Sequence, residues 1–156
     1  DKKWFYITSN RESPHEQHFY RMPVKGGKME RLTREPGNHR VTLSPDESHM
    51  AVLYSYSNQP WELFVQPIDK PAERKQLTHS TTEAFQAYSW RDPEIVRFKA
   101  SDGAEVPARL YRPENAASGG PAVIFVHGAG YLQNVHRWWS TYYREFMFHN
   151  FLVDHG

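Results

Sequence analysis

The sequence predicts a mixed fold, with all-β propeller blades in its first part and the start of an α/β domain in its second part. Two observations carry this prediction: a repeat of short strands in the first part, and an apolar run over residues 121–126 that leads into a glycine-rich turn. Aromatic residues make up 15% of the 156 residues, and side chains of this kind favour strands over a helical bundle.

The repeat is defined by two matched landmarks. Residues 19–24 match residues 63–68 at a spacing of 44, and residues 31–33 match residues 76–78 at a spacing of 45. Four short strands recurring every ~40–45 residues is the period of a propeller blade. Chance similarity between two hairpins is the alternative, but the shared strand order favours a true repeat. We therefore predict that residues 1–91 form the last two blades of a β-propeller.

The strands of this region are predicted from aromatic and β-branched runs that turn residues separate. Gly26 and Gly27 supply the positive φ of a tight hairpin, and Pro45 occupies the second position of a turn. We expect strands over residues 4–8, 18–24, 29–33, 40–43, 50–56, 61–68 and 74–78.

The pattern changes after residue 91, and residues 92–156 are predicted to form the start of an α/β domain. Alternating runs over 94–99 and 106–111 flank a hairpin turn. The run over 121–126 is continuous, which is typical of a strand buried on both faces. A helix is expected over 138–154, because its aromatic and aliphatic residues share one face, namely Trp139, Tyr142, Phe146 and Val153.

The glycine-rich turn after the apolar run is the candidate site. His127, Gly128, Ala129 and Gly130 stand where a loop can present backbone N–H groups to an oxyanion. The alternative is a tight turn from strand to helix that carries no chemistry.

Composition excludes several classes of partner and site. The net charge of +1 gives no reason to expect nucleic acid, no apolar stretch approaches membrane-spanning length, and the chain has no cysteine. His15 and His18 lack the H-E-x-x-H spacing of a helical zinc site, so we expect a solvated or rim loop there and no metal. We also expect no cofactor.

Motifs in chain order resemble one family. They are FYR (19–21), GGK (26–28), RLT (31–33), LSPD (43–46), DG (102–103), VPARLYRP (106–113) and VHGAG (126–130). Together they resemble the junction between propeller and catalytic domain in serine peptidases of the prolyl oligopeptidase type, closest to the bacterial dipeptidyl peptidase IV-like branch. The resemblance covers essentially the whole chain, and it implies that residues 92–156 begin an α/β-hydrolase domain.

The resemblance implies a serine exopeptidase that cuts peptides near their N-terminus, often after proline. In that family the segment matching residues 127–130 lines the oxyanion hole, commonly with a tyrosine where this chain has His127. Backbone N–H groups or the His127 imidazole would then replace the tyrosine donor, and Tyr131 is a weaker candidate. No serine here has a GxSxG context, so we expect the Ser, Asp and His of the triad beyond Gly156 and an inactive segment in isolation.

Several consequences of the resemblance stay open. A peptide is the expected partner, a homodimer is the expected form of the parent, and the periplasm or a secreted location is the expected compartment. The absent initiator methionine suggests missing upstream sequence, and residues 1–156 made alone are expected to be insoluble or oligomeric. The alternatives for function are a non-catalytic propeller that binds a peptide or protein, and an esterase on the same fold.

Overall fold

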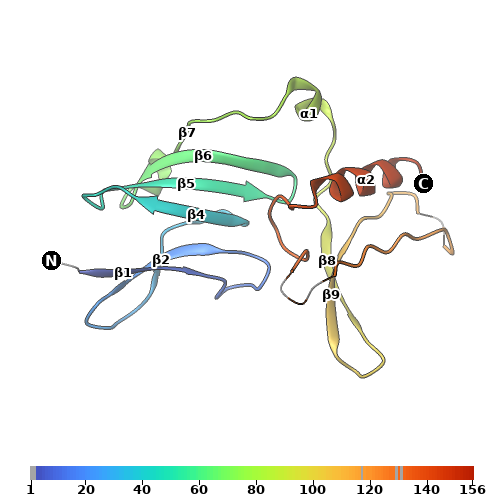
Figure 1. Ribbon diagram of the computed structural model, residues 1–156, viewed down its shortest axis with the longest axis horizontal. Helices are drawn as coiled ribbons and strands as arrows, with labels where there is room; N and C mark the ends of the chain where they lie inside the picture. The colour runs from blue at the N-terminus through green and yellow to red at the C-terminus, as the bar shows by residue number, and fades with distance from the viewer. Residues whose placement is uncertain (1–2, 117, 129, 131) are drawn as a thin grey trace. The chain divides into compact units, whose positions relative to one another are not determined.

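The computed structural model describes residues 3–116, 118–128, 130 and 132–156 (Figure 1). The chain divides into two compact units. The first comprises the chain through Tyr88 together with His136–Trp139, and the second comprises Ser89–Val135 and Ser140–Gly156. The four residues His136–Trp139 thus belong to the first unit, although the chain on either side of them belongs to the second.

The first sheet of the first unit has three antiparallel strands in the order β1-β2-β3. They are β1 (Trp4–Ser9), β2 (His18–Pro23) and β3 (Glu30–Arg31). Gly26 and Gly27, at φ of 87° and 135°, lie in the turn between β2 and β3, which confirms the predicted hairpin. The third strand is shorter than predicted, because only two of its residues pair with β2.

The second sheet has four antiparallel strands in the order β4-β5-β6-β7. They are β4 (Asn38–Leu43), β5 (His49–Tyr56), β6 (Gln59–Pro67) and β7 (Lys75–Gln76). The predicted repeat makes β2 and β3 equivalent to β6 and β7. Two small antiparallel sheets in succession are consistent with propeller blades.

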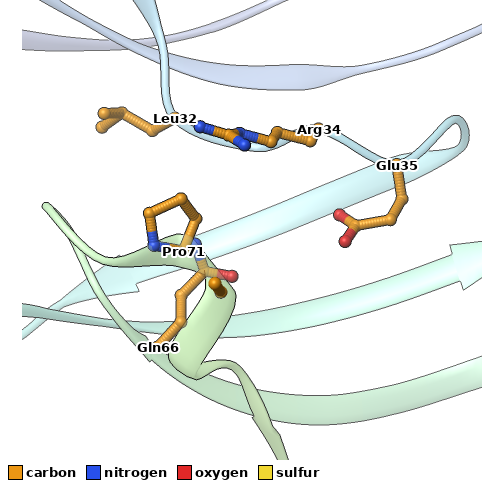
Figure 2. A pocket seen from close by; sticks show the side chains of 6 residues that line it. Leu32, Arg34, Glu35, Gln66 and Pro71 are labelled. Carbon is orange, nitrogen blue, oxygen red and sulfur yellow. The ribbon is translucent and has the colours of Figure 1, made fainter.

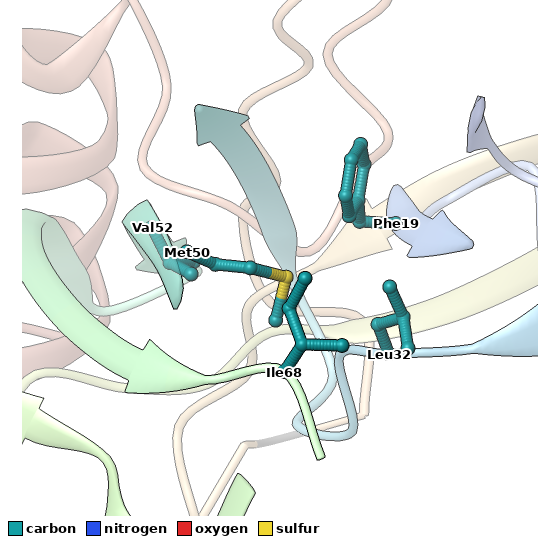
Figure 3. Close-up of a cluster of buried hydrophobic side chains, with 5 residues drawn as sticks. All are labelled: Phe19, Leu32, Met50, Val52 and Ile68. Carbon is teal, nitrogen blue, oxygen red and sulfur yellow. The ribbon is translucent and has the colours of Figure 1, made fainter. Parts of the chain in front are cut away.

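Buried side chains from both sheets form the core of the first unit. The members are Phe19, Leu32, Met50, Val52 and Ile68 (Figure 3). Met50 and Val52 are fully buried, and both lie on one face of β5 because alternate residues of a strand share a face. Burial of side chains of this size stabilises the fold by about 2 kcal/mol each.

Two short helical elements of the first unit were not predicted. They are the 3-10 helix η1 (Pro71–Glu73) and the helix α1 (Glu83–Ala87). The Thr82 hydroxyl caps α1 by accepting a hydrogen bond from the Phe85 N–H at 3.2 Å. Helices this short have no apolar period, so composition alone does not reveal them.

The second unit contains the hairpin of β8 (Glu94–Lys99) and β9 (Glu105–Leu110), followed by the helix α2 (Tyr143–Asp154). Phe146 and Val153 are buried on α2, as predicted, and the Phe146 ring packs against Trp90 at 5.7 Å. The buried Asn150 accepts a hydrogen bond from the Arg91 N–H at 2.9 Å. These contacts hold the helix to the start of the unit.

The prediction of a buried strand over residues 121–126 is wrong for this structure. These residues form no strand, and Val123, Ile124 and Val126 are 68%, 84% and 80% exposed. A strand forms only where a neighbouring strand takes up its backbone hydrogen bonds, and no described residue pairs with this segment.

The predicted helix begins five residues later than expected. Residues 138–142 are not helical, because the backbone N–H of Trp139 is taken by the Ser55 hydroxyl in the first unit, and Tyr142 serves as the N-cap. Trp139 therefore lies outside the helical face on which it was placed. Among the described residues, no helix combines the length and apolar character needed to cross a membrane.

Candidate functional site

The glycine loop lies in the second unit and is open. The His127 Nδ1–H donates to the Gly128 carbonyl oxygen at 3.0 Å, because a carbonyl oxygen can only accept. A Cβ atom built on Gly128 or Gly130 would meet no atom within 4 Å, so a ligand has free access to the backbone there. The other two predicted loop residues, Ala129 and Tyr131, lie outside the described residues.

Aromatic rings tie one residue of the apolar run to the helix. The Phe125 ring lies 5.7 Å from the Tyr142 ring and 5.9 Å from the His149 ring, and His149 lies 5.2 Å from Tyr111. Burial, with the nearby positive charge of Arg109, lowers the pKa of His149. Phe125 is nevertheless 41% exposed, so these ring contacts cover only part of it.

A pocket of about 200 Å³ lies in the first unit. Its lining residues are Leu32, Arg34, Glu35, Gln66, Pro71 and Ala72 (Figure 2). Small-molecule sites usually occupy about 300–1,000 Å³, so this pocket is small, and it combines a guanidinium, a carboxylate and an amide. None of the predicted site residues lines it.

Two histidines that sequence reasoning left apart are stacked in the interior of the first unit. The His18 and His39 rings lie 5.1 Å apart, each residue is 1% exposed, and Tyr54 lies 4.9 Å beyond His39. Burial lowers the pKa of His18 against the opposing effect of Glu16. The available signal was that His18 begins a predicted strand and is followed by two aromatic residues, both of which are buried in the structure.

The expectation of a solvated or rim loop is correct for His15 only in that this residue lies in a turn, because both His15 and His18 are buried and His18 lies in a strand. His15 is 8% exposed, and both ring nitrogens of His18 have partners: Nε2 lies 3.0 Å from the Glu16 carboxylate and Nδ1 lies 3.2 Å from the Thr33 hydroxyl. These bonds offset the cost of burying the imidazole. The described part of the chain holds no group of three or more side chains suited to a metal ion.

His39 leads to a second charged group. Its Nδ1–H donates to the Gln17 carbonyl at 3.0 Å, and its Nε2 lies 3.8 Å from Glu35, whose carboxylate also contacts the Arg74 guanidinium at 3.0 Å. The pKa of Glu35 is lowered to about 2, first by His39 and further by the positive charge of Arg74. The 3.8 Å separation is too long for a hydrogen bond and the Glu35 side chain is 48% exposed, so these three residues form a partly solvated group of charges.

The four residues His136–Trp139, called here the 136–139 segment, lie against the first unit. The Arg137 N–H donates to the His15 carbonyl at 2.8 Å, and the Trp139 N–H donates to the Ser55 hydroxyl at 2.7 Å. Sequence reasoning missed this contact, because it joins residues about 120 and 84 positions apart and no local pattern marks it.

Comparisons with known proteins point in one direction. Residues 1–61 match the family described as the dipeptidyl peptidase IV (DPP IV) N-terminal region. The chain is 24% identical over 149 residues to the probable dipeptidyl-aminopeptidase B of Aspergillus clavatus, and 24% identical over 153 residues to the protein of the same name from Neosartorya fischeri. Each match covers 91% of this chain and 16% of the relative, so the chain spans about one sixth of the length of these relatives.

A solved structure of a dipeptidyl peptidase is similar to this chain in fold. The structure of Porphyromonas gingivalis dipeptidyl peptidase 4 matches with a TM-score of 0.62 at 21% identity. The match covers 75% of this chain and 17% of that chain. At this identity the likeness concerns the fold.

Proposed function

We propose that this chain belongs to the dipeptidyl peptidase IV-like family and forms part of a serine exopeptidase that releases dipeptides from the N-terminus of peptides, often after proline. The observation that carries the proposal is the match to dipeptidyl-aminopeptidase B, which covers 91% of the chain and so extends across both units. The activity and substrates belong to the whole protein.

The proposed organisation follows the division of the chain. Residues 1–91 supply the last two blades of a propeller, and residues 92–156 begin an α/β-hydrolase catalytic domain. The two antiparallel sheets of the first unit support the first assignment. An apolar run that ends at an open glycine loop supports the second, because in α/β-hydrolases such a loop follows an early strand.

In the proposed reaction a serine attacks the peptide carbonyl, and the glycine loop stabilises the oxyanion that forms. We expect the Ser, His and Asp in the protein beyond Gly156. The open backbone of Gly128 and Gly130 favours N–H donors from the loop itself. The His127 ring already donates its Nδ1–H to the Gly128 carbonyl oxygen, so this proton is engaged within the loop.

The proposal is tested on the full-length protein with a Gly-Pro-p-nitroanilide reporter. Release of p-nitroaniline is expected, together with its loss after treatment with a serine-directed phosphonate. The matched control is the same reporter with an acetylated amino terminus, which an exopeptidase that requires a free amine leaves intact. No release from the free reporter would contradict the proposal, and hydrolysis of p-nitrophenyl acetate alone would favour an esterase.

A further inference from the structure

The two sheets of the first unit meet at a seam, where the residue before β2 lies beside the first residue of β4. Gln17 and Asn38 form a parallel bridge there. The Gln17 N–H donates to the Gly37 carbonyl at 2.9 Å, and the Gln17 carbonyl accepts the His39 N–H at 3.2 Å. Because the three-stranded and the four-stranded sheet are separate ladders, this bridge links their backbones.

His18 and His39 come directly after the bridge, one from each sheet, and fill the seam. Their rings stack at 5.1 Å, and each residue is 1% exposed. The His39 ring also joins the bridge, since its Nδ1–H donates to the Gln17 carbonyl at 3.0 Å. A charge on either ring would therefore lie between the two sheets, away from water.

The partners of His18 suit a neutral ring. The Thr33 hydroxyl accepts the Phe19 N–H at 3.0 Å and lies 3.2 Å from His18 Nδ1. When the hydroxyl proton points to Nδ1, the ring can donate its Nε2–H to the Glu16 carboxylate at 3.0 Å, and every group has a partner. A proton added at Nδ1 would make that nitrogen a donor facing the hydroxyl proton. A charged His18 therefore loses the hydrogen bond from Thr33.

The carboxylates near the pair are already matched by arginines. Glu16 lies in the loop before β2, with the Arg137 Nε of the 136–139 segment 3.6 Å away. Glu35 lies in the loop before β4, 3.8 Å from the His39 Nε2, with the Arg74 guanidinium at 3.0 Å. Neither carboxylate is thus an unshared counterion for a charged imidazole.

The remaining groups around the pair add no negative charge. Arg31 on β3 contributes a further positive charge near His18. The Tyr54 ring packs on His39, and burial raises the pKa of Tyr54 to about 12, so its hydroxyl stays neutral. Burial, with the effects of His39 and Arg31, lowers the pKa of His18 against the hydrogen bond to Glu16. Protonation of the pair therefore adds positive charge where three arginines already face two carboxylates.

We propose that the stacked pair of His18 and His39 is an acid-sensitive switch of the first unit, which holds the two sheets together while His18 is neutral and releases the seam when His18 takes up a proton. In the released state both rings reach water, where an imidazolium is well solvated and two charges no longer face each other at 5.1 Å. The inference concerns the first unit alone and is independent of the proposed peptidase activity.

The direction of the effect follows from proton linkage. The open state binds a proton on His18 with the ordinary pKa of 6.5, whereas the closed state binds it less readily. Closure is therefore fully favoured above pH 6.5 and weakens as the pH falls below that value. One proton changes the open population by up to about tenfold per pH unit, or about 30-fold between pH 7.5 and pH 5.0. Carboxylates with ordinary pKa values of about 4 stay ionised over this range.

The test is amide hydrogen exchange of the full-length protein at pH 7.5 and pH 5.0, corrected for the intrinsic pH dependence of exchange. Peptides covering 17–21 and 38–42, on either side of the seam, are expected to open about 30-fold more at pH 5.0, and a peptide covering 60–65 of β6 less than about threefold. His18→Gln keeps an amide donor but cannot be protonated, so its seam peptides should change less than about threefold. His49→Gln, at an exposed histidine of β5, is the matched control and should keep the full change.

Two further measurements keep the test decisive. If His18→Gln does not fold at pH 7.5, His18→Asn replaces it, because its shorter amide keeps an acceptor for Thr33. Exchange of the His18 ring C2 hydrogen in the wild type reports protonation of this ring directly, and a midpoint below pH 6.5 is expected. A wild-type change of less than about threefold at the seam, an equal change in β6, or the full change retained in His18→Gln would overturn the inference.

Discussion

Apolar residues of the first unit are buried in a core, whereas an apolar run of the second unit is exposed. In the first unit, Met50 and Val52 are fully buried between two sheets. In the second, Val123, Ile124 and Val126 form a continuous apolar run that is exposed. A β-hairpin pairs two strands that are close in sequence. A strand of a parallel sheet pairs only with strands that lie much further along the chain, so a short stretch of sequence is less able to bury it.

The largest expected effect is at Gly37, whose substitution tests the close packing of the first unit. Gly37→Ala should lower the free energy of unfolding by about 4 kcal/mol, because the new Cβ meets backbone at 2.3 Å and the φ of +126° strains an L-residue. Gly26→Ala is the control: its φ is +87° but no atom lies within 4 Å, so a loss of about 1 kcal/mol is expected. Equal losses in chemical denaturation would contradict the packing described.

Ile124→Asp tests whether the apolar run of the second unit is still exposed in the full-length protein. Ile124 is 84% exposed here, and a surface aspartate should cost less than about 0.5 kcal/mol. If further strands of an α/β-hydrolase sheet cover the run, as we propose, the buried charge should cost about 3 kcal/mol or more. Thermal unfolding of the full-length variant distinguishes these results, and a negligible loss would count against the sheet.

Met50→Ala measures how much a buried apolar side chain contributes to the stability of the first unit. Removing this fully buried side chain from the core should cost about 2.5 kcal/mol, as cavities left by large apolar side chains do. Met147→Ala on α2, where the residue is 41% exposed, is the matched substitution. A cost for Met147→Ala as large as that for Met50→Ala would show that α2 is covered in the full-length protein.

The smallest effect concerns acid stability of the first unit. The folded-state pKa of Glu35 lies at about 2 against an ordinary value of 4.5, so its contribution is present above pH 4.5 and is lost as the pH falls toward 2. Because the side chain is 48% exposed, solvent screening limits this contribution to about 1 kcal/mol. Glu35→Gln should flatten the decline between pH 4.5 and 2, and an unchanged slope would exclude Glu35 as its source.

How far the sequence predicts the structure follows the same division. The hairpin of β8 and β9 was predicted nearly residue by residue, because alternation and a turn at Gly103 are local signals. The burial of His18 and the hydrogen bond from Arg137 to Tyr56 were not predicted, since both depend on contacts that no local sequence pattern marks. The oxyanion role of residues 127–130 stays a prediction, because it depends on a nucleophile outside this sequence.

Hydrogen exchange of residues 121–126 in the full-length protein is the most direct test of the account. The proposal that these residues begin the sheet of an α/β-hydrolase domain predicts slow exchange, comparable to that of β5 in the blade core. Exchange as fast as in an exposed loop would mean that the run stays uncovered, and the assignment of residues 92–156 to a catalytic domain would be contradicted.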